Sequence, residues 1–243
     1  MNTKKKFLIF IPAYNVEDKI YSVVNRIPKK IFKSRITILI INDCSKDNTQ
    51  NEIIKIKKKF NYNFFIINNK KQLGYGGSQK IAFNYAIKNK FDILIMVHGD
   101  GQYAPEEIPR FINQYKNKNT MAVFGSRMLN YKSAIRGGMP IYKFIGNICL
   151  TFIQNLILGT NISEFHSGYR SFRVGALKNI NFKSKANYYH FDTEIIIELI
   201  KKNLELKEIP IPTHYGDEIS HLKSIPYGLN VLLSTIKYRF KIK

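Results

Sequence analysis

Short, nearly continuous apolar runs alternate with helical periodicity along the first half of the chain. The runs predict five buried strands, at residues 7–11, 36–41, 63–67, 92–97 and 121–124. Helical segments lie between them, at residues 17–26, from Asp47 or Asn48 to Lys59, and at 78–89. Strands and helices that alternate through short connections form a mostly parallel central sheet flanked by helices. The sequence therefore predicts an α/β fold.

Polar side chains follow three of these strands at the point where each strand ends: Asp43, Asp100 and Arg127. In an open α/β sheet, ligands bind outside the carboxyl ends of the strands. Asp100 has a glycine on either side, and together with Gln102 it offers the oxygen ligands that Mg²⁺ or Mn²⁺ prefers. The alternative is that Asp100 only caps a turn or the next helix.

A glycine-rich segment, LGYGGS at residues 73–78, precedes the third predicted helix. Its exposed amides would suit a phosphate at a helix N-terminus. A tight turn that needs a positive φ explains the glycines equally well. The segment lacks the spacing of the P-loop and of the dinucleotide-binding motif, which disfavours both classes.

The second half of the chain contains a long predicted helix at residues 139–158. Its polar residues argue against a bilayer span, which needs about 20 mostly apolar residues. Two interpretations remain open: the wide apolar face packs on the sheet, or it lies in a membrane interface. The polar residues recur along one stripe: Lys143, Asn147, Thr151, Gln154 and Asn155.

The remaining segments predict a site loop and a basic tail. The cluster SEFHSGYRSFR, at 163–173, is typical of a site loop that runs into a short strand. A helix at 191–202 and an edge strand with prolines at 206–212 follow. The end of the chain, at 227–243, predicts a second amphipathic helix that ends in KYRFKIK, a composition expected at an anionic membrane surface. We expect one domain at 1–224 and a tail at 225–243.

Composition narrows the class of protein. The 243 residues fit one sizeable core, and the net charge of +22 favours nucleic acid, anionic membranes or phosphorylated substrates as partners. No RNA-recognition, KH or helix-turn-helix signature is visible, so no nucleic-acid partner is expected. Cys44 and Cys149 lie far apart, which predicts neither a disulfide framework nor a zinc site. The apolar run after the basic N-terminus is too short for a signal peptide.

In this order, the segments resemble the motifs of family 2 glycosyltransferases with the GT-A (Rossmann-like) fold, especially the dolichyl-phosphate and polyprenyl-phosphate sugar transferases. IPAYN is similar to the family's PAYNE segment, INDCSKDNT to VDDGSTDGT, and LGYGGSQKIAFNYA to its glycine-rich turn and helix. HGDGQYAPEE resembles the DxD-type metal segment, with His98 in place of the first acid. GSR at 125–127, SGYR at 167–170 and ISHLKS at 219–224 resemble segments near the acceptor and the diphosphate.

The resemblance implies inverting transfer of a sugar from a GDP- or UDP-sugar, with Mg²⁺ or Mn²⁺ held by Asp100 and Gln102. It implies nucleotide contacts from Pro12, Ala13, Tyr14, Asn15, Glu17, Asp43, Gly74, Gly76, Lys80 and His98. It implies catalytic roles for Asp100, Arg127, Arg170 and Lys223, and acceptor contacts from Ser167, Gly168 and Arg170.

Two acceptors remain open. A polyprenyl phosphate is already anionic and needs no strong base, and it would give the amphipathic helices a purpose at the membrane surface. We then expect a peripheral protein on the cytoplasmic face, with or without a separate membrane protein as partner. A saccharide hydroxyl needs a base, for which Glu164 and His166 are the nearest candidates. A noncatalytic member of the family is a further alternative, because His98 replaces an acid. A basic nucleic-acid-binding protein is another, because it would explain the charge of +22.

Overall fold

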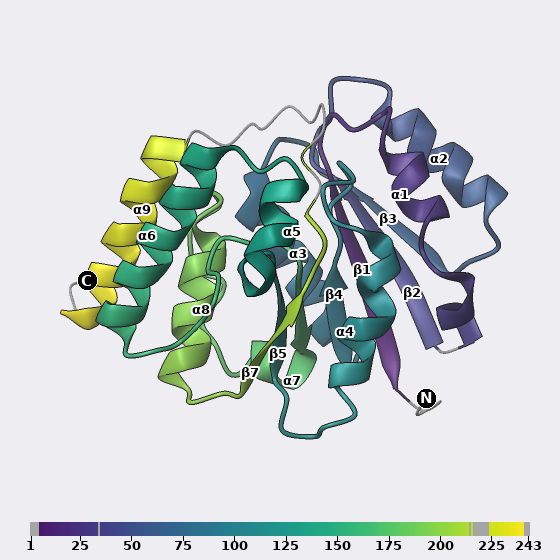
Figure 1. Cartoon of the computed structure of the whole chain (residues 1–243). Helices are drawn as coiled ribbons and strands as arrows, with labels where there is room; N and C mark the ends of the chain where they lie inside the picture. The colour runs from purple at the N-terminus through teal and green to yellow at the C-terminus, as the bar shows by residue number, and fades with distance from the viewer. Residues whose placement is uncertain (1–4, 34, 214, 216–223, 241–243) are drawn as a thin grey trace.

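The computed structural model describes residues 5–33, 35–213, 215 and 224–240, and it has helices on both faces of a central sheet (Figure 1). The strands are β1 (Lys6–Ala13), β2 (Arg35–Asn42), β3 (Phe64–Asn68), β4 (Ile93–Met96), β5 (Ala122–Ser126), β6 (Arg170–Arg173) and β7 (Leu206–Pro210). The α-helices are α1 (Ile20–Asn25), α2 (Thr49–Lys59), α3 (Gly74–Lys88), α4 (Ile108–Gln114), α5 (Tyr131–Arg136), α6 (Ile141–Leu158), α7 (Val174–Lys178), α8 (Phe191–Lys201) and α9 (Ser224–Arg239). Short 3-10 helices are η1 (Lys29–Lys33), η2 (Pro105–Glu107) and η3 (Met128–Asn130).

Within the described residues, the sheet contains seven strands in the order β3-β2-β1-β4-β6-β5-β7. The pairs from β3 to β4 are parallel, β6 is antiparallel to both β4 and β5, and β7 pairs parallel with β5. Since β6 opposes both of its neighbours, β5 points the same way as β4. Asp43, Asp100 and Arg127 therefore follow strands that end at one edge of the sheet, as predicted. The sequence did not predict the reversal at β6.

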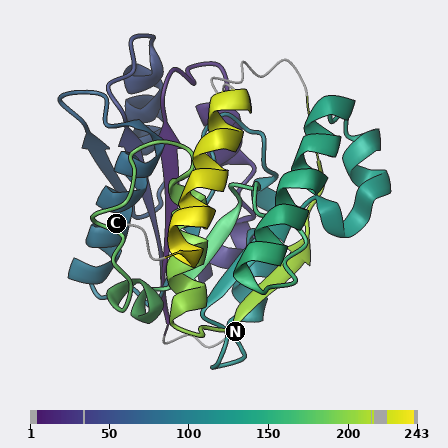
Figure 2. The same cartoon turned by 90° about the vertical axis from the view of Figure 1, so that its left-hand side faces the viewer.

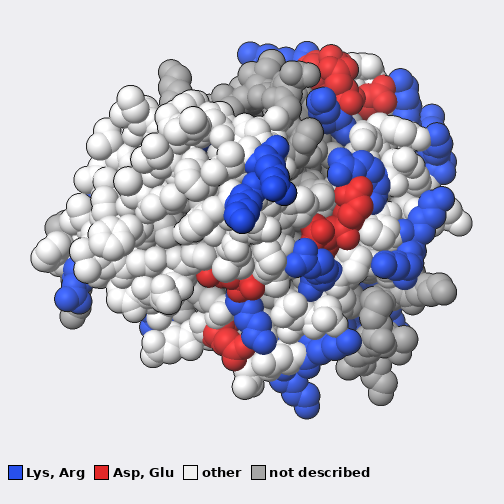
Figure 3. All heavy atoms as spheres, viewed as in Figure 1, with Lys and Arg blue, Asp and Glu red and all other residues white. Residues whose placement is uncertain are grey.

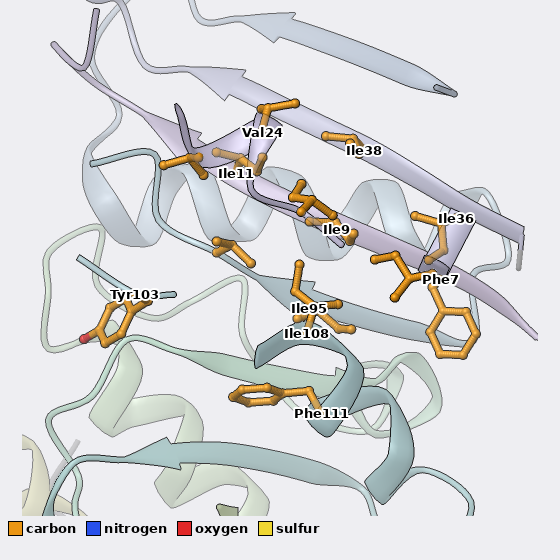
Figure 4. Packing of buried hydrophobic residues seen from close by; sticks show 14 of the residues in the cluster. Phe7, Ile9, Ile11, Val24, Ile36, Ile38, Ile95, Tyr103, Ile108 and Phe111 are labelled. Atoms are coloured by element: carbon orange, nitrogen blue, oxygen red, sulfur yellow. The ribbon is translucent and has the colours of Figure 1, made fainter. Parts of the chain in front are cut away.

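Two apolar layers hold the helices to the sheet. Alternate residues of β1 point to opposite faces, as the pleat of a strand requires. Ile9 and Ile11 belong to the layer under α1, α2 and α4, where Val24 of α1 meets them (Figure 4). Leu8 and Phe10 belong to the layer under α3, α7 and α8. The central strands are buried on both faces, which explains their continuous apolar sequences.

The helices α6 and α9 lie side by side at one end of the molecule, where α9 also packs on α8 (Figure 2). Val231 and Thr235 of α9 are buried in these contacts. The end of the chain is therefore a packed helix that begins at Ser224, a few residues before its predicted start.

The amphipathic pattern of α6 is inverted relative to an ordinary surface helix. Its polar residues Asn147, Thr151 and Gln154 are buried. Asn147 donates to the Glu164 carboxylate at 2.7 Å, and the amide of Asn155 bonds both the carbonyl and the N–H of Ile162. The apolar residues point outward, so the expectation that they pack on the sheet is wrong. The exposed apolar residues of this helix are Ile141, Tyr142, Ile145, Ile148, Phe152, Ile153 and Leu156.

Charge follows the same division of the surface. Figure 3 shows Lys and Arg spread over the part of this face that contains α1 and α2, while the surface over α6 and α9 is mostly uncharged. Exposed apolar residues of α9 extend that surface: Ile225, Leu229, Leu233 and Ile236, followed by Phe240. Among the described residues, α6 alone is long and apolar enough to cross a membrane, which by itself is weak evidence for a span.

Candidate active site

A cleft of about 860 Å³ opens at the carboxyl edge of the sheet. The loop after β1 forms one wall, the start of α3 forms another, and the turn after β4 closes the inner end. Most of the residues predicted to contact a nucleotide line this cleft: Pro12, Ala13, Tyr14, Asn15, Glu17, Asp43, Gly74 and His98. Their roles remain predictions, but the fold brings them together around one space.

Hydrogen bonds between two loops fix the outer wall of the cleft. Asn15 adopts a left-handed φ of 51°, and its side chain accepts from the Lys46 amide at 2.8 Å. The Glu17 carboxylate accepts from the Asn48 amide at 2.6 Å. Asp47 accepts from the amides of Glu17 and Thr49, and despite its partial burial these bonds lower the pKa of its carboxyl group. The β1 loop and the start of α2 therefore form a single unit.

Asp43 joins β2 to the glycine-rich segment. Its buried carboxylate accepts from the amides of Leu73 and Gly74, each at 2.8 Å, and from the Asn69 side chain at 2.7 Å. Three donors on a buried carboxylate hold it in one orientation. Its place in the cleft is thus fixed before any ligand arrives.

The glycine-rich segment is the first turn of α3, which begins at Gly74 instead of residue 78. Gly74 has a φ of 79°, as predicted for a residue that only glycine tolerates. Three of its amides are taken up within the protein: those of Leu73 and Gly74 bond Asp43, and that of Gly76 bonds the Asn187 carbonyl. A Cβ on Gly76 would come within 2.5 Å of the Ala186 carbonyl, so close backbone packing requires this glycine.

Two residues predicted to contact the nucleotide lie elsewhere. Gly76 faces the segment before α8, and Lys80 donates to Lys185 and Asn187 of that segment. In the described part of the chain, neither residue lines the cleft. Both attach α3 to the connection before α8, and their contact with a nucleotide stays a prediction.

Asp100 lies in a tight turn after β4. Its Oδ1 accepts from the Gln102 amide at 3.0 Å, and Gly101 supplies the positive φ of 77° that the turn needs. Nowhere in the described residues does a group of three His, Cys, Asp or Glu side chains form a complete metal site. One carboxylate with a neighbouring amide oxygen nevertheless fits Mg²⁺ or Mn²⁺, because such ions take several of their ligands from water and substrate phosphates.

His98 is enclosed by aromatic rings. The rings of Tyr75 and Tyr103 meet it edge-on, with centroids 5.6 and 4.9 Å away, and its Nε2 lies 3.3 Å from the Tyr75 hydroxyl. Gly168 lies against the imidazole, where a Cβ would approach Nε2 to 2.6 Å. Burial lowers the pKa of His98 more than Asp100 raises it, so the ring is neutral near pH 7.

A second pocket of about 320 Å³ lies on the other side of Asp100. Arg127 lines it and pairs with the buried Glu164, which accepts from the Arg127 backbone amide and guanidinium and from Asn147. Arg127 also donates to the Tyr215 hydroxyl at 2.8 Å. Of the residues that the structure describes, four line both the cleft and this pocket: Tyr75, His98, Asp100 and Tyr189.

Neither residue predicted as a base is suited to that role. Burial raises the pKa of Glu164, but the charge and hydrogen bonds of Arg127 outweigh it and hold the pKa below its ordinary value. Burial lowers the pKa of His166 to about 3, and its Nδ1 lies 2.9 Å from the Tyr227 hydroxyl of α9. Glu164 is an anion locked to Arg127, and His166 is a weakly basic imidazole in the wall of the second pocket.

Arg170 has a structural position. Its guanidinium is buried and donates to the carbonyls of Phe165, Ser167 and Asp192. Within the described chain it lines neither space, and the same holds for Ser167, whereas Gly168 and Gln102 line the second pocket. Arg170 therefore shapes the loop and is unavailable to an acceptor. Lys223 lies outside the described residues.

Sequence reasoning missed the residues that connect α3 with α8. Asp192 of α8 accepts from the Tyr75 hydroxyl and from Gln79, each at 2.8 Å, and its carboxylate lies 3.6 Å from Nε of Arg170. Asp192 and Tyr227 also line the second pocket. The only sequence feature that pointed to Asp192 was the acidic start of the predicted helix at 191–202. Acidic residues are common in the first turn of any helix, so this feature did not indicate a site.

The open sheet with a joined cleft and pocket at its carboxyl edge is the architecture of a GT-A glycosyltransferase. Comparison with known proteins agrees, because residues 8–180 match the model of the family described as glycosyl transferase family 2. The chain belongs to this family.

Individual relatives show the same relationship. The UDP-N-acetylglucosamine–dolichyl-phosphate N-acetylglucosaminyltransferase of Methanococcus voltae is 32% identical over 244 residues, which cover 94% of this chain and 92% of the relative. The polyprenol monophosphomannose synthase of Mycolicibacterium smegmatis is 22% identical over 212 residues, which cover 85% and 77%.

A solved structure confirms the fold. Glucosyl-3-phosphoglycerate synthase from Mycobacterium tuberculosis, in complex with Mg²⁺ and uridine diphosphate, aligns with a TM-score of 0.74 over 99% of this chain and 81% of its own. At 14% identity the similarity concerns the fold alone.

Proposed function

We propose that this protein transfers a sugar from a nucleoside diphosphate sugar to a polyprenyl phosphate, as a peripheral enzyme on the cytoplasmic face of a membrane. The observation that carries the proposal is the position of Asp100, which lines both the nucleotide-sized cleft and the second pocket. A donor in the first space and an acceptor in the second meet at this residue. The Methanococcus voltae relative, named for the same type of reaction, supports this assignment.

The reaction forms a bond between an acceptor phosphate oxygen and the anomeric carbon while the bond from that carbon to the donor diphosphate breaks. Asp100 and Gln102 would hold Mg²⁺ or Mn²⁺, which when bound neutralises charge on the diphosphate. The acceptor oxygen is already anionic, so no proton has to be removed. The unsuitability of Glu164 and His166 as bases supports a phosphate over a saccharide hydroxyl.

Charge and shape of the second pocket support the same acceptor. Lys143 lines it together with Arg127, whose charge is paired with Glu164, and the tyrosines Tyr215 and Tyr227 line it as well. Cations and hydroxyl donors are the groups that bind phosphate. The pocket-lining residues of α6 and α9 belong to the two helices that carry the apolar surface, and Tyr142 belongs to both, so the pocket lies beside that surface.

The apolar surface of α6 and α9 supports contact with a membrane. A contiguous exposed apolar surface on a soluble domain marks an interaction site. The bilayer interface accepts such a surface, and the basic residues Lys237 and Arg239 at the end of α9 suit anionic headgroups. A separate membrane protein is the other partner that would cover it.

The experiment is transfer from a panel of radiolabelled nucleotide sugars into a lipid-extractable product, with membranes and with Mg²⁺ or Mn²⁺. We expect label in the organic phase, and Asp100→Asn should lower it about a hundredfold or more, because the developing charge loses its main stabiliser. Asp92→Asn is the matched control, since Asp92 precedes the opposite end of β4 and its carboxylate accepts from only the Lys6 amide among described residues. Label in a water-soluble product would support a saccharide acceptor instead. An unchanged rate of sugar transfer in Asp100→Asn would refute the proposed site.

A further inference from the structure

Gly146 lies in the middle of α6, where glycine has no structural reason to be. Glycine inside a helix costs about 0.5–1 kcal/mol relative to alanine. A Cβ built on Gly146 meets no described atom within 4 Å, so close packing does not exclude a side chain. Gly146 therefore lowers the stability of the helix although a larger side chain would fit at this position.

The free space beside Gly146 belongs to the second pocket. Tyr142, Gly146 and Leu150 recur every four residues and line the pocket along one side of α6. Lys143 and Asn147 lie next to this row, and Asn147 leads to the pair of Glu164 and Arg127. The wall thus changes from charged near Arg127 to apolar along the row.

The apolar row reaches the outer surface. Tyr142 lines the pocket and is also 65% exposed, next to the exposed Ile141 and Ile145. On the facing helix, the exposed Ser224 lines the pocket as well. A ligand with an anionic head near Arg127 and an apolar body along the row would leave the pocket at the apolar surface of α6 and α9.

We infer that the row Tyr142–Gly146–Leu150 binds the first part of the acceptor's hydrocarbon chain, and that Gly146 provides the width for it. The inference rests on the proposed function and assigns a binding subsite within it. It explains why glycine is present at a helical position that alanine or leucine would otherwise stabilise.

The test compares Gly146→Leu with Gly175→Leu. Gly175 of α7 is the matched control, because it is exposed, also has nothing within 4 Å of a built Cβ, and in the described chain lines neither pocket. We expect Gly146→Leu to raise the KM for undecaprenyl phosphate about tenfold or more, equivalent to the burial of about two methylene groups. The KM for the nucleotide sugar and the binding to vesicles should stay unchanged, and Gly175→Leu should match the wild type in every measurement.

An unchanged acceptor KM in Gly146→Leu, with active wild-type enzyme, would overturn the inference and leave the proposed function intact. A rise in the KM for the donor that equals the rise for the acceptor would also overturn it, because the change would then act on the whole site. A wild type that transfers sugar to no polyprenyl phosphate would overturn both. Gly146→Ala separates the effect on binding from an effect on folding, because alanine stabilises the helix. We expect this variant to have a higher Tm than the wild type and a smaller rise in acceptor KM than Gly146→Leu.

Discussion

Replacing outward-facing apolar residues of α6 should weaken membrane binding without weakening the fold. We choose Phe152→Ser combined with Leu156→Ser, because these side chains are 67% and 74% exposed and lie one helical turn apart. Neither belongs to the buried core. Exposed substitutions of this kind change the free energy of unfolding by about 0.5 kcal/mol or less.

The exposed fractions set the size of the effect. Complete burial of a Leu or Phe side chain is worth about 1.5–3 kcal/mol. Scaled by exposures of 67% and 74%, full coverage of both residues by lipid is worth about 3 kcal/mol. Each 1.4 kcal/mol is about a tenfold change in affinity, so the double variant should bind vesicles roughly a hundredfold more weakly.

The assay is flotation of the full chain with vesicles of neutral and anionic phospholipids, with thermal unfolding measured in parallel. The control is Phe65→Ser with Ile54→Ser, two exposed apolar residues in β3 and α2, far from α6 along the sheet. We expect the control to float like the wild type. Equal flotation of both double variants would refute the reasoning, and a large drop in Tm for the α6 variant would show that its outer face packs within the protein.

Three further substitutions test individual contacts. Arg170→Lys should lower the free energy of unfolding by about 3 kcal/mol in urea titrations, since lysine cannot replace the fork that bonds three carbonyls, while the acceptor KM stays unchanged. Glu164→Gln should cost about 3–5 kcal/mol near pH 7, because it leaves Arg127 buried without its anion. The pKa of Glu164 is lower in the folded than in the unfolded protein, so this stabilisation is complete above about pH 4.5 and is lost as the pH falls through the folded value. In urea titrations, the difference in free energy of unfolding between wild type and Glu164→Gln should therefore be smaller at pH 4 than at pH 7. Gly168→Ala should displace the His98 ring and lower kcat, with a stability cost of about 1–3 kcal/mol measured by thermal unfolding; unchanged kcat would contradict the contact.

The sequence predicted the sheet well because its strands are buried on both faces and read as uninterrupted apolar runs. It also predicted the shared edge of Asp43, Asp100 and Arg127, since strand ends in a parallel sheet meet there. The antiparallel β6 was not predictable, because a short strand of polar composition carries no signal of direction. Its place between β4 and β5 depends on tertiary pairing.

The site was only partly predictable for a related reason. Residue types suggested that Arg170 and Glu164 were free to act, but Arg170 is bonded to carbonyls of its own loop and of α8, and Glu164 is bonded to Arg127, 37 residues away. The hydrogen bond from Tyr75 to Asp192 joins residues that are 117 positions apart, so no local sequence pattern predicts it. For α6 the sequence gives two faces without saying which is inside, and the hydrogen bond from Asn147 to Glu164 decides that the polar face is.

The cleft and the second pocket share one wall, so the proposed donor and acceptor would contact the same residues. Tyr75, His98, Asp100 and Tyr189 face both spaces, so a molecule bound on one side becomes part of the surroundings of the other. Linkage requires any coupling between the two affinities to be reciprocal: whatever factor a bound donor applies to acceptor affinity, a bound acceptor applies to donor affinity. An affinity measured for the donor or the acceptor alone would then describe a different state of the site from the one in which the sugar is transferred.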